Sequence, residues 1–223
     1  MANFNFPTQP QKQNSGGKVF PSDLLQGDRQ YYTTLSFTDY SFSSFLPQYF
    51  GGLSFAGGYK LPLPKRINDV NSQLWSEVHA SDMVPGLVQM GGSVGGVSFL
   101  SALQFMTYQR PAYKEHELQW TLSAANREES DNLKEMIKDI KASSAPSLTG
   151  KGTSYTYPKI CQVSFNPGEY LFKLKPCAVI SVAVDYTAAG GPSFYKSGAP
   201  TVIGLSLRLK EIQLWTREEL MQG

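Results

Sequence analysis

The chain has 223 residues, of which 41% are hydrophobic, 17% charged and 13% aromatic, and this length fits one domain with extensions. Its aromatic content argues against a disordered chain, which would lack the apolar surface that offsets the entropy of ordering. The formal net charge of +2 is too small to mark a nucleic-acid-binding protein by its overall field, and without about 18 consecutive apolar residues we expect no membrane insertion.

Residues 1–30 are interpreted as an N-terminal arm. They are rich in Gln, Asn, Pro and Gly and show no apolar periodicity, which is typical of an extended terminal segment. The first twenty residues lack the apolar run of a secretory signal, so we do not expect them to act as one.

Residues 31–109 are aromatic and interrupted by glycine pairs, and we expect an extended segment. Between Tyr31 and Tyr59 there are ten aromatic residues and a single charge, Asp39. Such a surface is either wrapped over the chain's own sheet or buried by another chain, and we favour the second alternative. The residues expected at this subunit interface are Tyr31, Tyr32, Phe37, Tyr40, Phe42, Phe45, Tyr49, Phe50, Val94, Val97 and Phe99.

The stretch 87–109 is uncharged and contains two glycine pairs, at 91–92 and 95–96. A phosphate-binding loop would need a following Lys-Ser/Thr or a GxGxxG register, and neither is present. We therefore interpret the stretch as a flexible loop or as the turn of a hairpin that projects from the fold.

Residues 110–223 are predicted to form a β core with one helix. Alternation of polar residues with Leu118, Trp120 and Leu122 indicates a half-buried strand. Asn126, with Glu129 in the capping-box position, predicts a helix over 126–142. The apolar stripe of that helix is Leu133, Met136, Ile137 and Ile140.

The remaining residues read as strands. Runs at 160–165 and 170–174 flank an Asn-Pro-Gly turn and predict a hairpin, and a strand follows over 180–186. Leu205, Leu207 and Leu209 alternate with polar residues, and a change of phase predicts a β-bulge near Lys210-Glu211. Inward-facing valines are expected at Val182 and Val184. Consecutive strands without crossover helices predict a β-rich α+β fold: an antiparallel sheet or barrel with one packed helix.

Residues able to perform chemistry are few. Cys161 and Cys177 are expected to be reduced thiols within strands, because two cysteines cannot make a disulfide framework. His79 and His116 show no zinc-ligand spacing with them, and no GxSxG or cysteine signature is present. Spacing alone leaves open a carboxylate pair such as Glu117 with Glu169. We predict no catalytic, metal or cofactor site, and expect His116 to be a structural histidine.

Two runs resemble the baseplate tail-tube proteins of contractile-tailed bacteriophages. Together they span about residues 110–220, half of the chain. The first run is Arg110-Pro-x-Tyr113, Leu118-x-Trp120-x-Leu122-Ser, Glu129-Ser130, Leu133, Ile137, Ile140-Lys141 and Ala145-Pro146. The second is Gly198-Ala-Pro-Thr201, Leu205-Ser-Leu-x-Leu209-Lys-Glu-Ile212, Leu214, Thr216 and Glu218.

The resemblance implies a tail-tube fold whose copies form a homo-hexameric ring, with the helix outside and one sheet face around a channel. It implies a structural virion protein of the baseplate, assembled in the host bacterial cytoplasm, that initiates the tail tube and sheath. The implied partners are the tail tube protein, baseplate hub and wedge proteins and the tail sheath, and the tape measure protein and DNA would pass through the lumen. The alternative is a baseplate or tail-fibre binding module that contacts host glycan or other tail proteins.

Overall fold

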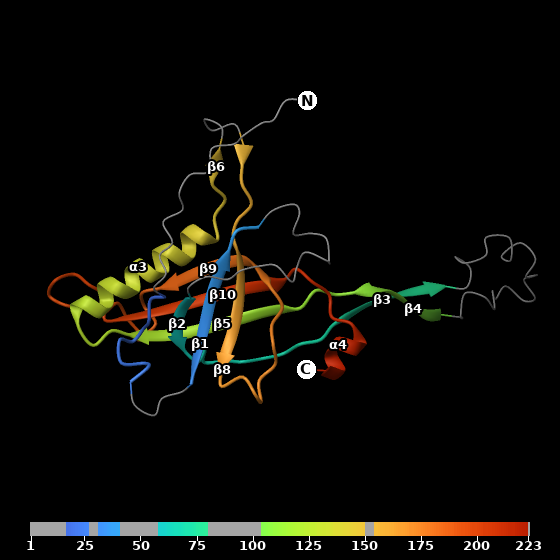
Figure 1. Cartoon of the computed structure of the whole chain (residues 1–223), viewed down its shortest axis with the longest axis horizontal. Helices are drawn as coiled ribbons and strands as arrows, with labels where there is room; N and C mark the ends of the chain where they lie inside the picture. The colour runs from blue at the N-terminus through green and yellow to red at the C-terminus, as the bar shows by residue number, and fades with distance from the viewer. Residues whose placement is uncertain (1–16, 27–30, 41–57, 80–103, 150–153, 223) are drawn as a thin grey trace, which may run out of the picture.

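The computed structural model describes residues 17–26, 31–40, 58–79, 104–149 and 154–222. Its main element is a six-stranded antiparallel sheet in the order β2-β1-β8-β9-β10-β5 (Figure 1). These strands are β1 (Tyr32–Thr38), β2 (Gly58–Pro62), β5 (Glu115–Ser123), β8 (Ile160–Asn166), β9 (Cys177–Asp185) and β10 (Val202–Glu211). The smaller elements are β3 (Gln73–His79) paired with β4 (Gln104–Pro111), β6 (Leu148–Thr149) paired with β7 (Ser154–Tyr155), and helices α3 (Arg127–Ser143) and α4 (Arg217–Gln222). The prediction of a β-rich α+β chain with one main antiparallel sheet is confirmed.

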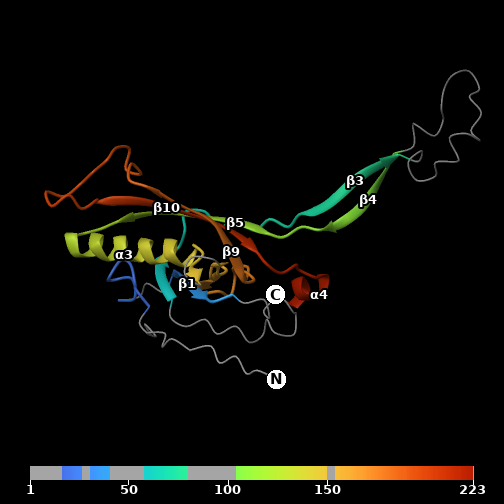
Figure 2. The same cartoon turned by 90° about the horizontal axis from the view of Figure 1, so that it is seen from above.

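The six-stranded sheet bends between β8 and β9. β8 pairs with β1 along its whole length, but with β9 only at Ile160–Ala178 and Cys161–Cys177. The half made of β2, β1 and β8 therefore crosses the half made of β9, β10 and β5 (Figure 1). Figure 2 shows that α3 and β1 lie on the same side of the β10–β5 layer, so the apolar core is enclosed between them.

The core follows from the alternation in β5 and the stripe of α3. Every second residue of β5 is buried, and so are the leucines of β10 that face the same way. Asn126 Oδ1 accepts a hydrogen bond from Glu129 N at 2.9 Å and caps α3, which begins and ends one residue later than predicted. The buried side chains include Leu118, Trp120, Leu122, Leu133, Met136, Ile137, Ile140, Leu205, Leu207 and Leu209, and Val182 and Val184 pack against them half-buried.

The predicted strand over 170–174 is absent, because the described residues between β8 and β9 form a loop. Its apolar residues pack inward from that loop: Phe172 stacks on His116, with ring centroids 5.5 Å apart, and Leu174 is buried. Gln162 Nε2 donates to the carbonyl of Leu174 at 2.6 Å. Packing against the core, not strand pairing, therefore produces the apolar pattern.

The β-bulge lies in β9, and the position predicted for it was wrong. Arg208 pairs with Ser181 and Leu209 with Val179, so Ile180 is the additional residue and is 55% exposed. The phase of β10 does not change after Leu209. Glu211 occupies the next inward position and is only 2% exposed.

β3 and β4 form a two-stranded ribbon that extends away from the sheet (Figure 2). The stretch 87–109 is predicted to be a flexible loop or the turn of a projecting hairpin, and the paired strands are 73–79 and 104–111. The two glycine pairs lie outside the described residues. Neither α3 nor α4 is long and apolar enough to span a lipid bilayer, and the same holds for any helix in the described ranges.

Candidate assembly surfaces

The outer edge of β5 presents backbone groups that are mostly unpaired. Gln119 turns its carbonyl away from β10, because this oxygen accepts a hydrogen bond from Lys65 N at 2.7 Å. Alternate residues of an antiparallel ladder share one orientation, so Glu117 and Thr121 also direct their N–H and C=O groups outward. The bond from Lys65 is the one backbone hydrogen bond to this edge within the described ranges.

The linker between β2 and β3 runs beside this edge without forming a ladder. It is attached by Trp120 Nε1, which donates to Pro62 O at 2.8 Å, and by Lys114 Nζ, which lies 2.8 Å from Asp69 Oδ1. Pro62 and Pro64 have no backbone N–H, so this stretch cannot pair regularly with β5. The edge is shielded but keeps unused hydrogen-bonding capacity.

The opposite edge of the sheet, at β2, is covered by the chain itself. Lys60 N donates to Lys18 O, and Phe20 N donates to Lys60 O, each at 2.9 Å. Phe20 is buried in the core, which holds this segment in place. Within the described residues, two backbone hydrogen bonds therefore reach the outer edge of β2 and one reaches the outer edge of β5.

The face of the sheet that points away from α3 consists of uncharged, mostly small residues in its middle. Gly204 pairs with Thr121, and Ser206 pairs with Gln119 on one side and Ala183 on the other. Directly paired residues point their side chains to the same face, so these five residues form one surface, here called the bare face. Its polar side-chain groups are the amide of Gln119 and the hydroxyls of Ser206 and Thr121. It therefore offers a partner few side-chain contacts.

The β3–β4 ribbon carries large apolar side chains that are exposed. Trp75 and Tyr108 pack edge to face with ring centroids 5.4 Å apart and are 53% and 49% exposed. Leu74 and Met106 are also exposed. An isolated two-stranded ribbon is at best marginally stable in water, and these side chains form an exposed apolar surface on it.

A buried polar cluster lies at the end of the sheet nearest the ribbon. The Glu211 carboxylate accepts hydrogen bonds from His116 Nε2 at 3.1 Å, from Lys175 N at 3.2 Å and from Trp215 Nε1. With Nε2–H donating to Glu211, His116 Nδ1 is left without a hydrogen-bond partner among the described residues. The donors come from β5, the β8–β9 loop and the segment after β10.

Trp215 connects this cluster to the neighbouring segments. Lys114 Nζ and Lys175 Nζ lie 5.2 Å and 4.6 Å from the centre of its ring, within the range of cation–π attraction. Lys175 Nζ also donates to Glu219 Oε2 of α4 at 2.7 Å. The cluster thus fixes the C-terminal segment to the sheet, and its location suits a structural role.

Cys161 and Cys177 are free thiols that face each other across β8 and β9. Burial raises the pKa of Cys161 to about 12 and also raises the pKa of Cys177. Because the thiolate is the nucleophile and the metal ligand, both side chains act in this fold as small core residues. The described residues contain no group of three or more His, Cys, Asp or Glu side chains placed to hold a metal ion.

Four of the residues predicted at a subunit interface lie in the described ranges. Tyr31 is 64% exposed, Tyr32 lies beneath Lys60 Nζ, Phe37 packs against Tyr59 and the chain's own core, and Tyr40 packs against Tyr157. For Phe37 the covering surface is therefore intramolecular. Phe42, Phe45, Tyr49, Phe50, Val94, Val97 and Phe99 lie outside the described residues.

Of the candidate catalytic side chains, His116 contacts a carboxylate, that of Glu211, at 3.1 Å. The side chain of His79 lies outside the described residues. Glu117 accepts a hydrogen bond from Gln119 Nε2 at 2.7 Å, and Glu169 lies in the β8–β9 loop. His116 was expected to be structural, but its partner Glu211 was not identified from the sequence.

Comparison with known proteins adds no relative. No protein-family model matches the chain, and no curated protein is significantly similar to it.

Proposed function

We propose that this chain is a structural subunit of a ring at the baseplate–tail tube junction of a contractile phage tail. Neighbouring copies pair through the outer edge of β5, and the ring offers a platform on which the tube and sheath assemble. The role requires no reaction and no cofactor. Both the protein family and the number of six subunits in the ring are taken from the resemblance of residues 110–220.

The unused hydrogen-bonding capacity at the outer edge of β5 is the observation that carries the proposal. A strand edge that keeps outward N–H and C=O groups can pair with a different surface of an identical subunit, and such head-to-tail addition closes into a ring when the rotation permits. Ring closure would satisfy the outward N–H and C=O groups of Glu117 and Thr121. It would also remove an edge that otherwise invites aggregation.

The bare face supports a channel wall. With α3 on the outside, this face would point toward the lumen, where the tape measure protein and then DNA would pass. Thr121, Gly204 and Ser206 present small uncharged groups, and Arg208 and Lys210 share the carboxylate of Glu115 at 3.2 Å and 2.9 Å. A wall without a strong positive field would let DNA slide, because phosphate binding grows with every unneutralised cation.

The β3–β4 ribbon supports contact with a further component of the particle. Its apolar side chains lie outside the sheet, so they remain available after β5 is paired. Contact with the tail tube protein or a hub protein would bury Trp75 and Tyr108. A binding module for host glycan or other tail proteins is the alternative, favoured by the same two exposed aromatic residues, and it would be a monomer or a trimer in solution.

The edge can be tested with one matched pair of variants. In Thr121→Pro the outward N–H is lost and the proline ring blocks the edge, whereas Thr121→Val keeps the N–H and nearly the same shape. Sedimentation velocity and negative-stain microscopy should show rings for the wild type and Thr121→Val, and monomers for Thr121→Pro with an unchanged far-UV circular dichroism spectrum. Rings of Thr121→Pro, or a wild type that remains monomeric even with tube subunits, would contradict the proposal.

A further inference from the structure

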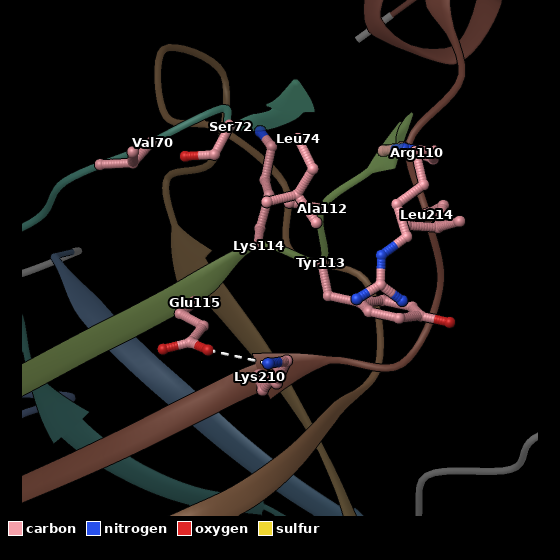
Figure 3. Close-up of a pocket in the computed structure, with 11 residues that line it drawn as sticks. Val70, Ser72, Leu74, Arg110, Ala112, Tyr113, Lys114, Glu115, Lys210 and Leu214 are labelled. Atoms are coloured by element: carbon pink, nitrogen blue, oxygen red, sulfur yellow. Dashed lines mark hydrogen bonds and ion pairs between the residues drawn. The ribbon is translucent and has the colours of Figure 1, made fainter. Parts of the chain in front are cut away.

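A cavity of about 520 Å³ lies where the β3–β4 ribbon joins the sheet, and ring closure through β5 does not use it. Figure 3 shows side chains around this space from the linker, from the β3–β4 ribbon and its connection to β5, from the start of β5, and from the end of β10 and the segment after it. Residues that are distant in the sequence therefore form its wall. This location is the junction between the body and the ribbon.

The wall contains three cations, Arg110, Lys114 and Lys210, and one carboxylate, Glu115. Lys114 is nearly buried and is neutralised by Asp69, outside the wall, at 2.8 Å. The other two cations are therefore the ones that could meet a ligand.

Glu115 does not neutralise the rest of the wall. Lys210 Nζ and Arg208 Nη2 lie 2.9 Å and 3.2 Å from its two oxygens, so a single negative charge serves two cations. These contacts, first the hydrogen bond from Lys210, also hold the pKa of Glu115 below its usual value. Arg110 is exposed and has no hydrogen bond or ion pair with the described residues. An unpaired guanidinium and an excess cation thus face the same space.

Apolar groups lie next to these cations. Leu74 is 43% exposed and Val70 is 49% exposed, and Leu214 is half-buried in the same wall. The backbone of a nucleic acid duplex would favour a track of cations without an apolar wall. A ligand for this wall needs carboxylates for the cations and apolar side chains for the apolar groups. An extended peptide in which acidic and apolar residues alternate provides both, because successive side chains of an extended chain point in opposite directions.

We propose that this cavity binds an acidic, extended segment of a partner protein. One carboxylate lies against the guanidinium of Arg110 and the ammonium of Lys210, and an apolar side chain packs on Leu74 and Leu214. Arg110 is the main anchor, because a guanidinium can hold a carboxylate with two parallel hydrogen bonds. The site lies at the opposite end of β5 from Thr121, so a partner bound here is compatible with paired edges.

The test uses the full-length protein and a fluorescein-labelled heptapeptide in which glutamate alternates with valine, with lysine in place of glutamate in the control peptide. Fluorescence anisotropy should show saturable binding of the glutamate peptide, weakened by salt. Arg110→Gln should raise its Kd about tenfold, and Arg110→Gln/Lys210→Gln should abolish binding. Lys138→Gln removes an exposed lysine from α3 and should leave the Kd unchanged.

Several results would overturn the inference. These are no binding of the glutamate peptide, equal binding by the double variant, equal binding of the lysine peptide, or preferential binding of a DNA duplex. If Arg110→Gln instead changes the sedimentation of the protein alone, the occupant is a second copy of the chain and the inference is wrong. Ring formation is measured separately with the Thr121 variants, so failure of one proposal does not imply failure of the other.

Discussion

The buried carboxylate of Glu211 should be one of the most sensitive positions in the fold. Glu211→Ala removes the acceptor shared by His116 Nε2, Lys175 N and Trp215 Nε1. Each buried donor left without an acceptor costs about 1–3 kcal/mol. Because water can enter the space that the side chain leaves, the costs will not add fully. We expect a loss of about 3–5 kcal/mol in the free energy of unfolding, the range found when a buried polar pair is broken.

The control for this substitution is Glu115→Ala. Glu115 is also a glutamate near the same end of the sheet with two nitrogen partners, but it is exposed. Exposed ion pairs contribute at most about 1 kcal/mol. Urea unfolding followed by tryptophan fluorescence and far-UV circular dichroism measures both variants, provided that the denaturant slope stays constant. If the two losses agree within about 1 kcal/mol, the Glu211 cluster does not stabilise the fold as argued.

Two further substitutions test the core and the start of α3. Leu207→Asp places a carboxylate at a fully buried position, and desolvation of that charge should leave no soluble folded protein. A cooperative, wild-type-like thermal transition would show that the face is not buried. Hydrogen bonds to Glu129, first from the Ser22 hydroxyl, lower the pKa of its carboxyl. The stabilisation from these hydrogen bonds is complete at pH values above the pKa that Glu129 has in the unfolded chain. It is lost as the pH falls through the lower pKa that Glu129 has in the folded protein. The deficit of Glu129→Gln in urea unfolding should therefore shrink between about pH 6 and about pH 3, and a constant deficit would contradict this.

Local signals explain which elements the sequence predicts well. The cap at Asn126 and the stripe from Leu133 to Ile140 lie within one helix, and the observed helix differs by a single residue at each end. Alternation in β5 is likewise local. The strand predicted over 170–174 fails because Phe172 and Leu174 owe their burial to contacts with distant elements, which periodicity cannot distinguish from strand pairing.

The polar cluster was missed because a glutamate after a leucine run resembles a surface residue. A signal was nevertheless present. Every second residue of β10 points into the core, and this series continues from Leu207 and Leu209 to Glu211. The corresponding series in β5 includes Leu118 and His116. Following both phases past the last leucine would have placed an acid and a histidine on the same side of neighbouring strands.

The position of β10 has a consequence for synthesis of the chain. β10 lies between β9 and β5, yet it follows β5 in the sequence by about 80 residues. While the ribosome makes the intervening segment, β5 lacks the strand that pairs with its inner edge, and α3 has only part of the surface that it finally covers. Formation of the interior of the sheet must therefore await the last strand, and closing so long a loop late slows folding. Nascent chains are thus at their most vulnerable to wrong pairing in the interval before residues 202–211 emerge.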